Sequence, residues 1–234
     1  DPGEGWTFVW SRLASEPEDS LVCNTVSASG MARGVTLVDT DPACYRVISA
    51  APLPSAVHVV KLVNGEDRND PADPLAVRTG TTVTWTYLVT VSGDSAQITA
   101  IVDDNGTPGT GDDFVPVYVG GDANGNGLLD PGEVWEYRWS RTATESVDTV
   151  VCNTVQVDAR WGESDSASAT DVACYRVVAG GPVGGNQVGI TLVKLVNGVD
   201  SRDPLNPLVV LPGSTVTWTY AITNTGTAPL SGVV

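Results

Sequence analysis

The sequence predicts an all-β protein made of tandem β-sandwich repeats, and three observations support this prediction. Apolar and polar residues alternate in runs that are separated by short segments rich in Gly, Pro, Asn and Asp. Long sequence motifs recur along the chain at a nearly constant offset. Four cysteines form two pairs with almost the same spacing.

Two segments show the alternation most clearly. In residues 82–90 the apolar positions include Trp85 and Tyr87, and the positions between them are mostly Thr. In residues 135–141 three aromatic residues alternate with Glu, Arg and Ser. A period of two predicts antiparallel sheets with one buried face. About six to nine such strands in about 120 residues fit an immunoglobulin-like sandwich, whose core would come from these aromatic side chains.

The internal repeat predicts the domain organisation. DPGEGWTFVWSR at Asp1 recurs as DPGEVWEYRWSR at Asp130, an offset of 129, and TVTWTY at Thr82 recurs at Thr215, an offset of 133. Most of this growth, three residues, falls between Tyr45 and Lys61 in a stretch rich in Pro and Gly, which marks the stretch as a linker. We therefore expect a complete repeat at 57–179, linkers at 50–56 and 180–187, the C-terminal part of one repeat at 1–49, and the N-terminal part of another at 188–234.

This organisation predicts how the partial repeats are completed. We expect the chain to be a window on a longer array, in which sequence outside the window or a neighbouring identical chain supplies the missing strands. The alternative is a monomeric stalk seen through arbitrary boundaries.

The cysteine spacing predicts one disulfide in each repeat. The two members of a pair are 21 or 22 residues apart and lie symmetrically about a loop, so they would face each other across a hairpin. Free, buried thiols are the alternative. Disulfides would place the protein in an oxidising environment, secreted or at the cell surface. The predicted pairs are Cys23–Cys44 and Cys152–Cys174.

A twelve-residue segment predicts a calcium site. Residues 122–133, DANGNGLLDPGE, match the pattern D-x-[DN]-x-[DN]-G-x5-E of calcium-binding loops. Alternating side-chain oxygens and one carbonyl would surround the ion, and the final Glu would close the shell. A solvated acidic turn is the alternative. The predicted ligands are Asp122, Asn124, Asn126, the carbonyl of Leu128, Asp130 and Glu133.

A second acidic segment precedes this loop, at residues 103–113. Asp104, Asp112 and Asp113 are candidates for a further cation site, but their spacing matches no fixed pattern.

A lysine recurs inside an apolar strand, as Lys61 in HVVKLV and Lys194 in TLVKLV. An unpaired buried ammonium group is costly, so Lys61 needs a partner. Asn153 lies in a similarly apolar late strand, and Asp103 is a nearby carboxylate in this interpretation. Lys, Asn and a carboxylate are the components of the intramolecular isopeptide bonds of Gram-positive pilins and adhesins. The alternative is a snorkelling lysine and an asparagine bonded to backbone.

The motifs as a whole are similar to the "conserved repeat domain" of large bacterial and archaeal cell-surface proteins. The segments that carry the resemblance are KLVNGVD, TVTWTYAITNTGTAPLSGVV, GDANGNGLLDPGEVWEY, CNTV and DVACYRV, which together cover nearly the whole chain. The resemblance implies immunoglobulin-like sandwiches in tandem arrays at the cell surface, without enzymatic activity. Val91 replaces the Asn of the TNTG run in the complete repeat, and the cysteine pairs stand out as an addition to the family pattern.

Composition excludes several classes of function. The net charge of −16 repels nucleic acid and anionic membranes, and no apolar run is long enough to insert into a membrane. His58 is the single histidine and belongs to no catalytic set, so an enzyme is not expected. The leading hypothesis is a structural shaft, stalk or fibre, rigidified by calcium and disulfides, whose partners are neighbouring repeats or identical chains. The alternative is an adhesin module that binds a glycan or protein through its loops.

Overall fold

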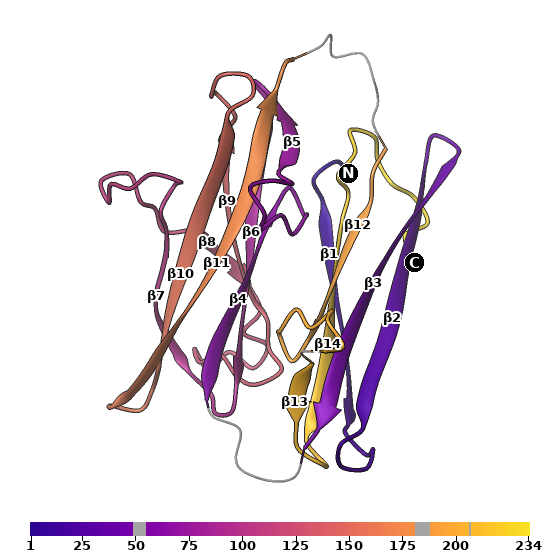
Figure 1. The fold of residues 1–234 in the computed structure, drawn as a ribbon, viewed down its shortest axis with the longest axis vertical. Helices are drawn as coiled ribbons and strands as arrows, with labels where there is room; N and C mark the ends of the chain where they lie inside the picture. The colour runs from indigo at the N-terminus through magenta and orange to yellow at the C-terminus, as the bar shows by residue number, and fades with distance from the viewer. Residues whose placement is uncertain (49–54, 181–187, 206) are drawn as a thin grey trace.

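The computed structural model describes residues 1–48, 55–180, 188–205 and 207–234, and within these residues all regular elements are β-strands. The predicted all-β class is therefore confirmed. Most of the predicted linkers, 50–56 and 180–187, lies outside the described residues. Figure 1 shows two groups of strands side by side, with their long directions roughly aligned.

Residues 55–180 form the first group, which we call the central sandwich. One sheet has the strand order β4-β6-β9-β8, and the other has the order β5-β11-β10-β7. The predicted alternating segments lie in β6 and β9. The strands are β4 (Ala56–Val63), β5 (Leu75–Arg78), β6 (Thr82–Ser92), β7 (Gln97–Asp103), β8 (Val117–Gly120), β9 (Trp135–Thr142), β10 (Val150–Trp161) and β11 (Asp165–Val178).

The core of the central sandwich lies between its two sheets. Trp85 and Tyr87 point into it from β6 and are fully buried, as the alternation predicted. Tyr175 enters from β11 in the opposite sheet, and its ring meets that of Trp85 edge to face at 6.0 Å. Aromatic residues thus join the two sheets at the centre of the core.

The second group, the composite sandwich, is built from residues 1–48 and 188–234. Its sheets have the strand orders β12-β14-β1 and β13-β3-β2, and the repeat offsets map these orders onto β4-β6-β9 and β5-β11-β10. The strands are β1 (Gly5–Leu13), β2 (Leu21–Ala32), β3 (Val35–Val47), β12 (Thr191–Val196), β13 (Leu208–Val210) and β14 (Thr215–Thr223).

The two ends of the chain complete each other in the composite sandwich. β1 pairs antiparallel with β14 over the register Gly5↔Thr223 to Leu13↔Thr215, and β13 pairs in parallel with β3. The repeat pattern predicted that sequence outside this window or a neighbouring chain would supply the missing strands. The structure shows another route, in which the two partial repeats combine within one chain.

The apolar character of β4 on both faces now has a structural reason. Val57, Val59 and Lys61 point into the core of the central sandwich. Val60 and Leu62 point the other way, into a separate apolar cluster that includes residues of β12. A strand buried on both faces needs no polar face, which explains the pattern that placed Lys61 among apolar neighbours.

Candidate functional site

The buried lysine of the central sandwich lies where the sequence analysis expected it, beside Asp103 and Asn153. Its Nζ atom is 2.6 Å from Oδ2 of Asp103, and it donates a hydrogen bond of 2.7 Å to the backbone oxygen of Asn153. Asn153 in turn donates from Nδ2 to Oδ1 of Asp103, at 2.7 Å. The three residues come from β4, β7 and β10, so the site connects both sheets.

The site is shielded from water. The side chains of Lys61 and Asp103 are both 0% exposed. Burial lowers the pKa of Lys61 to about 8, and the negative charge of Asp103 opposes this shift. A lowered pKa makes the neutral, nucleophilic amine accessible near physiological pH.

Tyr87 completes the site, although no sequence motif assigned it a role there. Its hydroxyl donates to Oδ2 of Asp103 at 2.7 Å, and the Nζ atom of Lys61 lies 5.6 Å from the centre of its ring. Burial and the negative charge of Asp103 raise the pKa of Tyr87, so it remains a donor. The signal in the sequence was its inward position in the alternating run.

The structural alternative for this site, a snorkelling lysine and a backbone-bound asparagine, does not describe what is observed. Lys61 is fully buried, and the side chain of Asn153 bonds to a carboxylate. Oδ1 of Asn153 is buried without a hydrogen-bond partner, which is uncommon for a purely structural amide. The site is a buried ion pair with an amide held against the same carboxylate.

The equivalent lysine of the composite sandwich has different surroundings. Lys194 Nζ donates to both the backbone oxygen and Oδ1 of Asn24, the counterpart of Asn153. Asn24 is exposed, and the offset of 133 places the counterpart of Asp103 beyond Val234. Within residues 1–234 the two sandwiches share the Lys–Asn pair, and the carboxylate that acts on Lys194 is Asp41, the counterpart of Asp171.

The predicted calcium loop closes on itself through its own side chains. Asp122 accepts hydrogen bonds from the backbone N–H groups of Gly125 and Gly127, at 2.8 and 2.9 Å. Glu133 accepts from the backbone N–H of Ala123 at 2.8 Å, so the last motif position meets the start of the loop. Leu129 anchors the loop, since it is buried in the core and bridges to Ala96.

The side chains of this loop can surround a cation if two of its amide groups rotate. Asn124 and Asn126 turn Nδ2 toward Oδ2 of Asp130, at 2.6 and 2.8 Å. Among the described residues, no three His, Cys, Asp or Glu side chains already converge as a metal site. Rotating the two amides would present Oδ1 in place of Nδ2. The loop then offers the oxygen ligands that calcium takes.

The second acidic segment does not gather its carboxylates. Asp104 accepts hydrogen bonds from the backbone N–H groups of Thr154 and Gly106, at 2.7 and 2.8 Å. Asp112 instead binds the side chains of Asn105 and Thr107. Oδ1 of Asp113 is buried without a hydrogen-bond partner. The three carboxylates therefore do not converge on one point that could hold a cation.

Both predicted disulfides are confirmed. Cys152 faces Cys174 across the hairpin of β10 and β11, and Cys23 faces Cys44 across that of β2 and β3. In each hairpin the Cα atoms are 4.1 Å apart. Cys152 precedes Asn153, so the disulfide and the buried lysine site meet at one point of β10.

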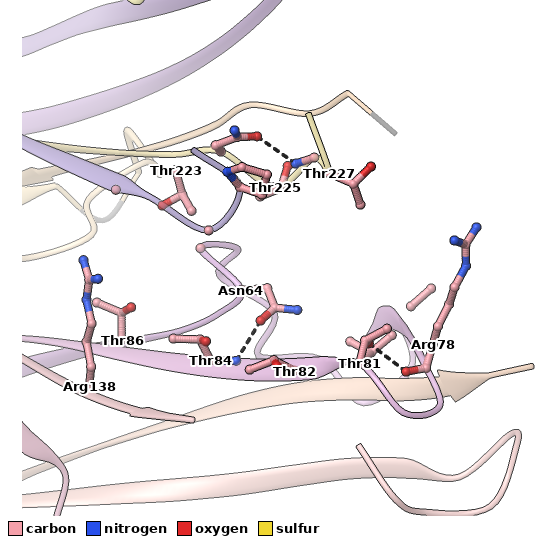
Figure 2. A pocket seen from close by; sticks show the side chains of 18 of the residues that line it. Asn64, Arg78, Thr81, Thr82, Thr84, Thr86, Arg138, Thr223, Thr225 and Thr227 are labelled. Carbon is pink, nitrogen blue, oxygen red and sulfur yellow. Dashed lines mark hydrogen bonds between the residues drawn. The ribbon is translucent and has the colours of Figure 1, made fainter. Parts of the chain in front are cut away.

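A cavity of about 710 Å³ lies between the two sandwiches (Figure 2). Its walls carry many threonine hydroxyls, and Figure 2 shows Arg78 and Arg138 toward opposite sides. None of its described lining residues is aromatic. Ligand sites are usually lined by apolar and aromatic side chains, so this cavity is a weak candidate for a glycan or peptide site.

A scan against models of protein families finds no match, and a search of curated proteins finds no significant match either. Within the described residues, no helix is long and apolar enough to cross a membrane.

Proposed function

We propose that this chain is a tension-bearing segment of a secreted or cell-surface structural protein, a shaft, stalk or fibre of tandem immunoglobulin-like repeats. The observation that carries the proposal is the contact of Lys61 with Asp103 and Asn153, next to the Cys152–Cys174 disulfide. A bond between Lys61 and Asn153, followed by Cys152–Cys174, would join the first strand to the last through two adjacent residues of β10.

This covalent path would protect most of the sandwich from force. Tension entering at β4 would pass through Lys61 to Asn153, then from Cys152 to Cys174 and out along β11. The residues between Lys61 and Cys152 would lie outside the path. A fold that only transmits tension gains from such a path, whereas an enzyme or a loop-based binding module does not.

The contacts at Asp103 provide a route for the bond to form. Oδ2 takes a proton from Nζ of Lys61, and the neutral amine attacks Cγ of Asn153. The Nζ–Cγ bond forms, the first proton passes from Asp103 to Nδ2, and the Cγ–Nδ2 bond breaks so that Nδ2 leaves as ammonia. Nζ gives up its second proton to Asp103 as it becomes the amide N–H, so Asp103 ends protonated. Each carboxylate oxygen already contacts the group with which it would exchange the proton.

Intact mass decides whether the amide is present. After reduction of the disulfides, we expect the mass of the chain to fall short of its sequence mass by one ammonia. Only one is expected, because the Lys194–Asn24 pair has no counterpart of Asp103 within residues 1–234. Asp103→Asn should restore the full sequence mass. A wild-type chain with the full mass would contradict the amide.

Single-molecule stretching tests the function itself. When the whole chain is pulled from its ends, the composite sandwich should open and the central sandwich should add almost no length. Lys61→Met should release about 90 further residues, roughly 300 Å at ~3.4 Å per extended residue. An equally long step in the wild-type chain would contradict the tension-bearing role.

Calcium is the proposed cofactor, bound by the 122–133 loop. Because the ion would join the two ends of the loop beside the buried Leu129, we expect a chelator to lower the melting temperature. Asp122→Asn with Glu133→Gln should remove this sensitivity, and Asp112→Asn, in the other acidic segment, should retain it. Calorimetric titration of calcium into the wild-type chain, showing no binding, would contradict the proposal.

The runner-up function is an adhesin module that binds a glycan or protein ligand. The threonine-lined cavity of Figure 2 is the feature that favours it. Saturable binding on a glycan array that is lost on Arg138→Ala would support this function over the shaft.

A further inference from the structure

The two sandwiches meet through equivalent surfaces. Val60 and Leu62 of β4 pack against Val193 and Leu195 of β12 in one apolar cluster. At the repeat offset of 133, Val193 and Leu195 are the counterparts of Val60 and Leu62. Leu88 of β6 also belongs to this cluster, and its counterpart in β14, Ala221, packs against it. Each sandwich therefore offers the outer face of the same two strands.

Contacts at the edges of this face obey two-fold symmetry, because each contact has an equivalent in which the two repeats change places. Gly65 lies against Thr223, and Gly198 lies against Thr90. At the repeat offset of 133, Gly198 is the counterpart of Gly65, and Thr223 is the counterpart of Thr90. The two contacts are therefore equivalent, with the roles of the two repeats exchanged. Residue i touching j′ while j touches i′ defines an isologous interface.

Both glycines are required at these contacts. A Cβ atom at Gly65 would stand 2.4 Å from the side chain of Thr223, and one at Gly198 would stand 1.7 Å from Oγ1 of Thr90. Thr191, at the start of β12, donates from its hydroxyl to the carbonyl of Gly65, just beyond the end of β4. β4 and β12 therefore run antiparallel across the interface (Figure 1).

Two equivalent carboxylates also meet at this interface. Asp67 and its counterpart Asp200 are both bound by Arg202, whose Nη2 atom is 2.6 Å from Oδ2 of Asp67. The side chain of Asp67 is only 6% exposed. Burial and the charge of Asp200 raise the pKa of Asp67 to about 7, and Arg202 opposes this shift. The interface thus brings two carboxylates together with one cation, Arg202, whose side chain is 46% exposed.

We infer that the outer face of β4 and β6 is a self-complementary pairing face, which binds the same face of another repeat antiparallel about a two-fold axis, with Arg202 selecting an unlike repeat as the partner. This inference goes beyond the proposed function and does not depend on the Lys61–Asn153 bond. It makes the side-by-side pair of repeats the building unit of the array, in place of single repeats joined end to end.

The preference for an unlike repeat as partner follows from the residue type at the repeat position of Arg202. The counterpart of Arg202 in the central sandwich is Asn69, which lines a cavity at the interface together with Asp67 and Asp200. Two central repeats from different chains would bring two Asp67 carboxylates together without a counterpart of Arg202, since the neighbouring Arg68 is bound by Glu66 and Asp73. An unpaired buried charge disfavours that pairing strongly. The central repeat therefore pairs with a repeat that carries Arg at this position, which in this chain is the composite sandwich.

An exchange of residues between the two repeats tests the inference on the whole chain. In small-angle X-ray scattering, Arg202→Asn should increase the radius of gyration over the wild-type value, which for a compact chain of this length is about 18 Å. The double variant Asn69→Arg/Arg202→Asn places the cation on the other side of the axis and should restore the wild-type profile. Arg160→Asn, which removes the same charge from β10, should change nothing.

A check of folding and a second variant make each scattering result interpretable. Tryptophan fluorescence and disulfide mapping establish that every variant is folded. Leu88→Lys, which places a charge only on the pairing face, should separate the sandwiches even if the Arg202 variant does not. Unchanged scattering of the Leu88 variant would overturn the pairing face, and failure of the double variant to close would overturn its symmetry. Dimers of the Arg202 variant in sedimentation would overturn the selection of an unlike partner.

Discussion

Replacing Asp103 with alanine is expected to lower the free energy of unfolding of the central sandwich by about 3–5 kcal/mol, the range for breaking a buried ion pair. Lys61 would keep its buried position without its 2.6 Å partner, and Tyr87 and Asn153 would lose an acceptor. Loss of the amide would add to the effect. Denaturant unfolding followed by tryptophan fluorescence measures the change.

A second variant separates the ion pair from the amide. Lys61→Met/Asp103→Leu removes both charges and keeps the apolar volume, so most of the stability that the ion pair provides should return. Its mass should still equal the sequence mass. An Asp103→Ala chain as stable as the wild type would show that the site is not buried as described.

Truncating Trp85 or Trp218 to alanine should each cost about 3–5 kcal/mol, but in different sandwiches. Both side chains are essentially fully buried, and each contacts a tyrosine of the opposite sheet. Trp218→Ala should expose the amides of residues 1–48 and 188–234 to hydrogen exchange while the central sandwich stays protected. Trp85→Ala should produce the reverse pattern.

A half-exposed residue of the same sheet provides the control. Phe8 on β1 is 52% exposed, so Phe8→Ala should change exchange little. Equal loss of protection in both sandwiches after either tryptophan change would mean that the chain unfolds as one cooperative unit.

Local sequence patterns predicted the strands and the hairpins well, because both depend on short-range periodicity. Cys152 and Cys174 were placed opposite each other from symmetry about one loop, and their register in the hairpin agrees. The cost of a buried ammonium group showed only that Lys61 needs a partner. Asp103 and Asn153 were assigned to it from the similarity to the isopeptide sites of pilins and adhesins.

The relation between the two sandwiches could not be predicted in the same way. The repeat showed that residues 1–49 and 188–234 belong to the same kind of domain, but not that they pair with each other. The apolar residues on both sides of Lys61 indicated a strand buried on both faces. They did not indicate which segment packs against Val60. Only the three-dimensional structure relates Gly65 to Thr223, because each residue taken alone fits an ordinary turn or strand end.

The pairing of β1 with β14 has a consequence for the behaviour of the chain in solution. The two halves of the composite sandwich are tethered by the residues between them, so each meets the other at an effective concentration on the order of millimolar. A second chain competes for the same strands only when its own concentration approaches that value. Dilute protein therefore stays closed on itself, whereas crowding chains together favours exchange, in which residues 188–234 of one chain complete residues 1–48 of the next and form an open-ended polymer.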